Sequence, residues 1–152
     1  MFERTVDTPF GPLTLTEEDG ALTRVDWRET SRLDDTPLLR EAEAQLKAYA
    51  ASTLKTFDLP TRVTGSALQQ AVCAALQAIP LGETLTYGDI ARQVGASAQA
   101  VGQACGGNPL PVIIPCHRVM GAGGKLTGFS GKGGVETKVA LLRHEGAGAF
   151  LL

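Results

Sequence analysis

The fold is decided by the stretch Tyr87-Gly88-Asp89-Ile90-Ala91-Arg92-Gln93-Val94-Gly95-Ala96-Ser97-Ala98-Gln99-Ala100-Val101-Gly102-Gln103-Ala104-Cys105. It predicts two short helices, over 87–94 and 97–105, divided at Gly95. A longer helix precedes them and stops before Pro80, because its apolar residues recur at helical spacing: Leu68, Val72, Ala75, Leu76 and Ile79. A longer helix followed by two short, tightly joined ones is the pattern of a helix-turn-helix module. We therefore expect an α-rich winged helix-turn-helix domain over residues 65–152. Its last helix should carry Val135, Val139 and Leu142 on one face and end at Gly146.

The first half of the chain predicts a different architecture, an α/β domain over residues 1–60. Leu13 and Leu15 alternate with threonines, as in a half-buried strand, and further strands are expected near 2–6 and 22–27. A helix should begin at Pro37, because an apolar stripe follows it: Leu39, Ala42, Leu46 and Tyr49. Residues 51–65 read as a connector.

Charge is divided unevenly along the 152 residues. The whole chain has a net charge of −2, which argues weakly against a nucleic-acid partner. Residues 1–60 carry a net charge of −5, however, and residues 61–152 carry +3. The second half is therefore the part suited to phosphate.

The remaining totals exclude several classes of protein. The sequence has no apolar run of the roughly 18 residues that a membrane helix needs, and its amino terminus does not resemble a secretory signal. Three cysteines cannot all pair, which favours free thiols in a reducing cytoplasm. The sequence has only two histidines and no Cys-x-x-Cys spacing, so it does not indicate a zinc site and we expect no metal.

Cys116 stands in an unusual setting, after the apolar run Val112-Ile113-Ile114-Pro115 and before His117-Arg118. A thiol attacks as thiolate, and neighbouring cations lower its pKa. A lone intracellular cysteine is otherwise most often a small buried hydrophobic residue, which is how we interpret Cys73 and Cys105. The basic neighbours make Cys116 a candidate nucleophile.

These motifs resemble one known family. Asn108-Pro109 followed by Ile113-Ile114-Pro115-Cys116-His117-Arg118-Val119 resembles the O6-alkylguanine-DNA alkyltransferases, also called methylated-DNA–protein-cysteine methyltransferases. Further matches are Ile79-Pro80-Leu81-Gly82-Glu83-Thr84 before Tyr87, Ala100-Val101-Gly102, Gly128-Phe129-Ser130-Gly131 and Glu145-Gly146. The match covers about residues 65–147, and the resemblance implies an RNase H-like fold for the first half.

The resemblance implies a single-use repair reaction without a cofactor. Such a protein binds double-stranded DNA, rotates an O6-alkylguanine (or an O4-alkylthymine) out of the stack and transfers the alkyl group irreversibly to its own cysteine. By resemblance, Cys116 is the nucleophile, His117 deprotonates it through a bridging water, and Glu145 fixes the histidine tautomer. Tyr87 donates a proton or hydrogen bond to the departing guanine.

The resemblance also assigns the binding residues. Ser130 belongs to the lid over the alkylguanine and hydrogen-bonds toward O6, with a turn former in a glycine-rich loop as the alternative. Phe129, where the family more often has tyrosine, also binds the substrate, and the Val119 carbonyl binds the guanine amino group. Asn108 braces the turn between the recognition helix and an active-site strand. Gln99, Ala100, Gly102 and Arg118 form the DNA-binding set, with an electrostatic or structural role as the alternative for Arg118.

The sequence departs from the family motif at Gln99. At this position the family carries an arginine, which enters the duplex and occupies the space that the rotated base leaves. Glutamine can still hydrogen-bond a base edge. The segment between Tyr87 and Gln99 is about two residues shorter than usual, and the one at Gly131-Lys132-Gly133-Gly134 about two longer. The alternatives are a non-enzymatic sensor of alkylated bases, an alkyltransferase with an altered substrate, and a cysteine hydrolase. In every case we expect a monomer that does not bind membranes.

Overall fold

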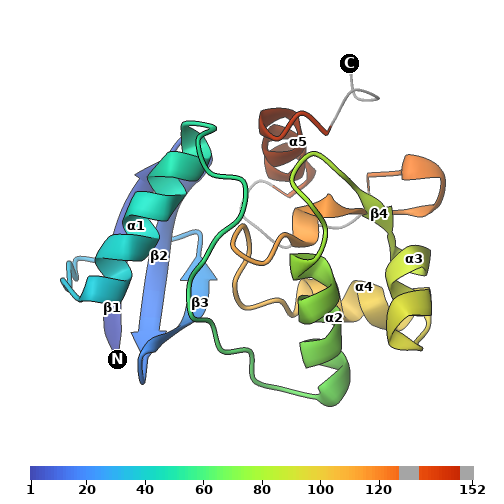
Figure 1. The fold of residues 1–152 in the computed structure, drawn as a ribbon, viewed down its shortest axis with the longest axis horizontal. Helices are drawn as coiled ribbons and strands as arrows, with labels where there is room; N and C mark the ends of the chain where they lie inside the picture. The colour runs from blue at the N-terminus through green and yellow to red at the C-terminus, as the bar shows by residue number, and fades with distance from the viewer. Residues whose placement is uncertain (127–133, 148–152) are drawn as a thin grey trace. The chain divides into compact units, whose positions relative to one another are not determined.

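The computed structural model describes residues 1–126 and 134–147 and divides the chain into two compact units, Met1–Arg62 and Val63–Leu152 (Figure 1). Each unit has its own elements and its own buried core. Ser130 and Phe129 lie outside the described residues.

The first unit contains a three-stranded antiparallel sheet in the order β1-β2-β3. Its strands are β1 (Phe2–Thr8), β2 (Gly11–Glu18) and β3 (Ala21–Asp26), so the predicted sheet is confirmed. Gly11 opens β2 with φ of +109°, and a Cβ built there would lie 3.3 Å from the Trp27 ring. Glycine is therefore required at this turn for both conformation and space.

Strand β2 differs from the expected half-buried pattern, because Thr14 and Thr16 are buried as completely as Leu13 and Leu15. The Thr14 hydroxyl donates to the carbonyl of Arg28 at 2.7 Å, and the segment after β3 thus runs over the polar face of the strand. Alternation in the sequence identified the strand correctly. It could not show that a later loop covers the second face.

Helix α1 (Pro37–Ala50) packs against β1 and β2 with Leu39, Ala42, Leu46 and Tyr49, as predicted. Thr36 caps it, accepting a hydrogen bond from the Leu39 amide at 3.0 Å. The following segment forms no helix, and its Pro60 and Arg62 pair with Leu22 through backbone hydrogen bonds of 2.9 Å. These bonds cover the outer edge of β3.

The second unit is built on three helices that pack on one another: α2 (Ala67–Gln77), α3 (Tyr87–Val94) and α4 (Ala98–Gly106) (Figure 1). A reciprocal pair of hydrogen bonds between Thr86 and Asp89 caps α3, and Gly95 ends it at φ of +72°. Ser97 caps α4. The predicted helix-turn-helix arrangement is thereby confirmed.

The second unit also holds the chain on both sides of Cys116. Strands β4 (Leu85–Thr86) and β5 (Val119–Met120) pair in parallel, and the short 3₁₀ helices η1 (Cys116–Arg118) and η2 (Ala122–Gly124) lie before and after β5. Helix α5 (Val135–His144) ends at Glu145, with Gly146 next at φ of +75°. The active-site strand expected after the turn at Asn108 begins only at Val119, because a 3₁₀ turn follows Pro115 and contains Cys116, His117 and Arg118.

Two features are absent from residues 1–126 and 134–147. No helix among them has the length and apolar character to cross a membrane. No three histidine, cysteine or acidic side chains among them lie close enough to share a metal ion.

Candidate active site

Cys116 is held in a rigid turn and is 7% exposed. Its amide donates to the Ile114 carbonyl at 2.8 Å. Asn108 holds the same turn from the other end, donating from Nδ2 to the Ile114 carbonyl at 2.8 Å and accepting from the Leu110 amide at 3.0 Å. Val112, within this turn, has φ of +73°, a conformation that a β-branched residue adopts only when its surroundings impose it.

Glu145 is a buried carboxylate that binds both residues following the cysteine. Its Oε2 lies 2.6 Å from Nε2 of His117. Arg118 donates from Nε to Oε1 at 2.8 Å and from its terminal nitrogen to Oε2 at 3.1 Å. A third hydrogen bond of Arg118 goes to the Ile79 carbonyl at 2.7 Å. Glu145 therefore ties the end of α5 to η1, and Arg118 in turn ties η1 to Ile79 in the segment after α2.

These contacts fix the tautomer of His117, which is completely buried. Because Glu145 is an acceptor, the network places the histidine proton on Nε2. Nδ1 then carries a lone pair, and it has no hydrogen-bond partner among the described residues. Burial lowers the pKa of His117, against the opposing effect of Glu145, so the imidazole is neutral near pH 7. Nδ1 is thus a base ready to accept a proton.

The thiol of Cys116 has a raised pKa, which differs from the lowering expected from its basic neighbours. Burial is the largest cause, because it disfavours the charged thiolate. A hydrogen bond with Asn108 and the charge of Lys138 act in the opposite direction. The resting residue is therefore a thiol, and its attack requires a base.

Lys138 is a fully buried lysine beside this site. Its ammonium donates to the Val119 carbonyl at 2.6 Å and lies 6.0 Å from the centre of the Tyr87 ring. Burial lowers the pKa of Lys138, whereas the neighbouring thiols Cys116 and Cys105 oppose that lowering. One cation thus lies near the nucleophile, the tyrosine and a carbonyl on β5.

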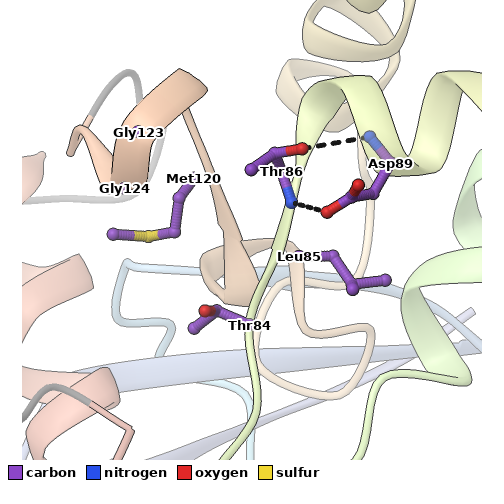
Figure 2. A pocket seen from close by; sticks show the side chains of 7 residues that line it. All are labelled: Thr84, Leu85, Thr86, Asp89, Met120, Gly123 and Gly124. Atoms are coloured by element: carbon purple, nitrogen blue, oxygen red, sulfur yellow. Dashed lines mark hydrogen bonds between the residues drawn. The ribbon is translucent and has the colours of Figure 1, made fainter.

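A hollow of about 350 Å³ opens next to the start of α3 (Figure 2). Thr84, Thr86 and Asp89 line one side, and Met120, Gly123 and Gly124 line the other. Asp89 is bound to the Thr86 amide at 2.9 Å and to Arg92. Cys116 does not line this hollow.

Comparison with known proteins decides the family. Residues 67–147 match the model of the 6-O-methylguanine DNA methyltransferase DNA-binding domain, and residues 1–63 match the ribonuclease-like domain of the same proteins. The chain belongs to the 6-O-methylguanine DNA methyltransferase family. A methylated-DNA–protein-cysteine methyltransferase of Mycobacterium bovis is 47% identical over 93% of this chain and 90% of the relative. The constitutive one of Bacillus subtilis is 44% identical over 93% of both chains.

Solved structures give the same result. The Mycobacterium tuberculosis O6-methylguanine methyltransferase superposes with a TM-score of 0.85 at 44% identity, over 96% of this chain and 93% of that one. The M. tuberculosis protein in complex with DNA superposes with a TM-score of 0.87, over 97% and 94%. The fold class expected from the sequence is therefore confirmed.

The structure brings several of the methyltransferase residues named above into one place. His117 and Glu145 are in direct contact, and Asn108 supports the turn that presents Cys116. Arg118 is 6% exposed and is engaged by Glu145 and Ile79, so we assign it to the buried network and not to the DNA surface.

The residues expected at the DNA lie on α4. Gln99 is exposed, and Ala100 and Gly102 are half-buried. A Cβ added at Gly102 would lie more than 4 Å from every neighbouring atom of the described residues, so another molecule can approach the backbone closely there.

Lys138 is the residue that sequence reasoning missed. The signal was present, because Lys138 and Glu145 fall at helical spacing on the face of α5 that also carries Leu141 and Leu142, and all four are buried. A lysine on the apolar face of a helix is a candidate for function, since burying an ammonium has a high free-energy cost.

Proposed function

We propose that this chain repairs O6-alkylguanine in duplex DNA, with O4-alkylthymine as a second substrate, by transferring the alkyl group irreversibly to Cys116. The observation that carries the proposal is the buried pair of His117 and Glu145, which leaves Nδ1 as a neutral base next in sequence to a buried thiol. Activation by a base suits a thiol whose pKa burial has raised.

The proton of the Cys116 thiol passes to Nδ1 of His117, through a bridging water, as the sulfur attacks. Glu145 stabilises the imidazolium that forms, because its carboxylate already accepts from Nε2 at 2.6 Å. The carboxylate also neutralises Arg118, so the site holds two cationic partners around one anion while the proton is in transit.

Transfer forms the bond from Sγ to the alkyl carbon and breaks the bond from that carbon to O6. The electron pair of the broken bond returns to the guanine ring, which takes up a proton and leaves as ordinary guanine. Tyr87 donates a hydrogen bond or proton toward the ring, with Lys138 6.0 Å from the tyrosine ring centre. The net result moves one proton from thiol to guanine and leaves a thioether, which does not release the alkyl group.

The DNA side of the proposal rests on α4, with Gln99, Ala100 and Gly102 facing the duplex. The Val119 carbonyl retains a second lone pair beside its hydrogen bond from Lys138, and this pair would accept from the guanine amino group. Ser130 and Phe129, outside the described residues, complete the proposed set of substrate-binding residues.

We further propose that residues 65–152 carry DNA binding and catalysis and that residues 1–60 form an accessory domain. Three buried cysteines without disulfides support a cytoplasmic protein. The large exposed apolar side chains among the described residues are few (Met1, Phe2, Leu33 and Val135), which supports a monomer.

Three serine variants test the nucleophile. Duplex DNA carrying a radiolabelled O6-methyl group is incubated with the wild type, Cys116→Ser, Cys73→Ser and Cys105→Ser. We expect label on the protein for all but Cys116→Ser, which should still bind the duplex. Labelling of Cys116→Ser would refute the choice of nucleophile, and lesion binding without any labelling of the wild type would identify a damage sensor.

A further inference from the structure

The exposed face of helix α4 extends beyond Gln99, the position at which the family carries an arginine. Val101, Ala104 and Cys105 are buried against the rest of the unit. Gln99, Gln103 and Gly106 are exposed, and their spacing of four and three residues places them on one face of the helix. Gln103 therefore follows Gln99 by one turn, about 6 Å along the helix axis.

Gln103 borders a hollow of about 220 Å³ between α4 and the beginning of α2. The other lining residues are Ser66, Leu68, Gln69, Ala100 and Ala104. Gln69 is committed inside the protein, because its Nε2 donates to the Ala104 carbonyl at 2.8 Å and to the Cys73 sulfur at 3.5 Å. The side chains of Gln99 and Gln103, in contrast, have no hydrogen-bond partner among the described residues.

We propose that Gln103 is a second DNA-contacting residue of α4, whose amide hydrogen-bonds the strand that runs past the hollow between α4 and the start of α2. The proposal rests on the proposed function, in which α4 faces the duplex. It adds Gln103 to the proposed DNA-contacting residues Gln99, Ala100 and Gly102. It also identifies duplex DNA as the molecule that binds at this hollow.

The chemistry of the amide suits this position. An amide offers two donor hydrogens and an acceptor oxygen, so it can bind base edges, sugar oxygens or phosphate oxygens. Two neutral amides one turn apart supply hydrogen bonds where a single arginine would supply both hydrogen bonds and charge. Because Gln103 is neutral, its contact contributes to affinity without counterion release.

A charge scan at position 103 tests the contact with a matched control. Gln77 is the control because it is an exposed glutamine at the far end of α2. It lies eleven residues, about 16 Å along that helix, from Ser66, which lines the hollow. Binding of unmodified duplex DNA is measured against salt concentration for Gln103→Lys, Gln103→Glu, Gln77→Lys and Gln77→Glu. A lysine that meets a phosphate should steepen the slope of log affinity against log salt by about 0.9.

We expect the steeper slope for Gln103→Lys alone and a loss of affinity of tenfold or more for Gln103→Glu alone. The transfer rate with free O6-methylguanine base should stay within twofold of wild type in Gln103→Glu, which shows that the fold and the thiol chemistry persist. Equal slopes and equal losses at positions 103 and 77 would overturn the proposal. Wild-type protein without salt-dependent DNA binding would instead overturn the proposed function itself.

Discussion

Replacing Glu145 with glutamine should separate the chemistry of the site from its stability. Glutamine keeps the shape and one acceptor oxygen, but it removes the charge that accepts from His117 and Arg118. The guanidinium of Arg118 then remains buried with the Ile79 carbonyl as its other partner. Removing one partner of a buried ion pair costs about 3–5 kcal/mol, and we take about 3 because an oxygen is retained. For a chain of this size that corresponds to a fall in Tm of about 6–12 °C.

The transfer rate should fall further than stability alone explains. The imidazolium that forms on His117 would lose its carboxylate, and the tautomer would no longer be fixed. Loss of the equivalent carboxylate in a hydrolase triad lowers the rate about 10⁴-fold, so we expect a loss of about 10²- to 10⁴-fold here. The assay is the single-turnover rate of methyl transfer from duplex DNA, followed by protein mass, beside a thermal melt.

A double variant completes this test. Glu145→Gln combined with Arg118→Met removes the stranded cation, and it should regain most of the lost stability while remaining as slow as Glu145→Gln. Glu136→Gln, in the exposed first turn of α5, is the matched control and should resemble the wild type. A rate within threefold of wild type in Glu145→Gln would refute the relay. A double variant no more stable than the single one would refute the reasoning about the buried charge.

Three further predictions follow from the same site. Because the pKa of His117 lies below its ordinary 6.5 and that of Cys116 above its ordinary 9.0, the transfer rate should be level from pH 6.5 to 9.0. In His117→Gln it should instead rise about tenfold per pH unit as thiolate forms, and a level profile in that variant would exclude histidine as the base. Lys138→Met should leave Tm unchanged or higher, because an ammonium is no longer buried. It should also slow transfer about tenfold, which is equivalent to about 1.4 kcal/mol of activation free energy. An unchanged rate would show that the charge of Lys138 does not assist Cys116. Gln99→Arg should accelerate repair of duplex DNA more than reaction with the free base, and equal acceleration of both would place the limiting step elsewhere.

Local patterns predicted most of the fold. The apolar stripes of α1 and α2, Pro37, and Gly95 each act within a few residues, so their consequences are readable from the chain. The turn at Cys116 was not readable. It depends on Asn108 and on the positive φ of Val112, a conformation that the residue type itself disfavours.

The candidate site was predicted unevenly for the same reason. Cys116, His117 and Glu145 were identified through resemblance to a family motif. The contact between His117 and Glu145 spans 28 residues of sequence, which the local pattern alone could not connect. The direction of the Cys116 pKa depends on burial, which the sequence does not display, and the cation that opposes the rise is the distant Lys138. The sequence left the role of Arg118 open between DNA binding and structure, because its buried partners Glu145 and Ile79 come from distant segments.

The most direct test of single-use transfer to Cys116 is the intact mass of the protein after incubation with excess duplex DNA containing O6-methylguanine, followed by peptide mapping. We predict a gain of one methyl group per chain, located on Cys116, with no repair beyond one lesion per protein molecule. Repair that continues past one lesion per chain, or a methyl group found on any other residue, would contradict the account.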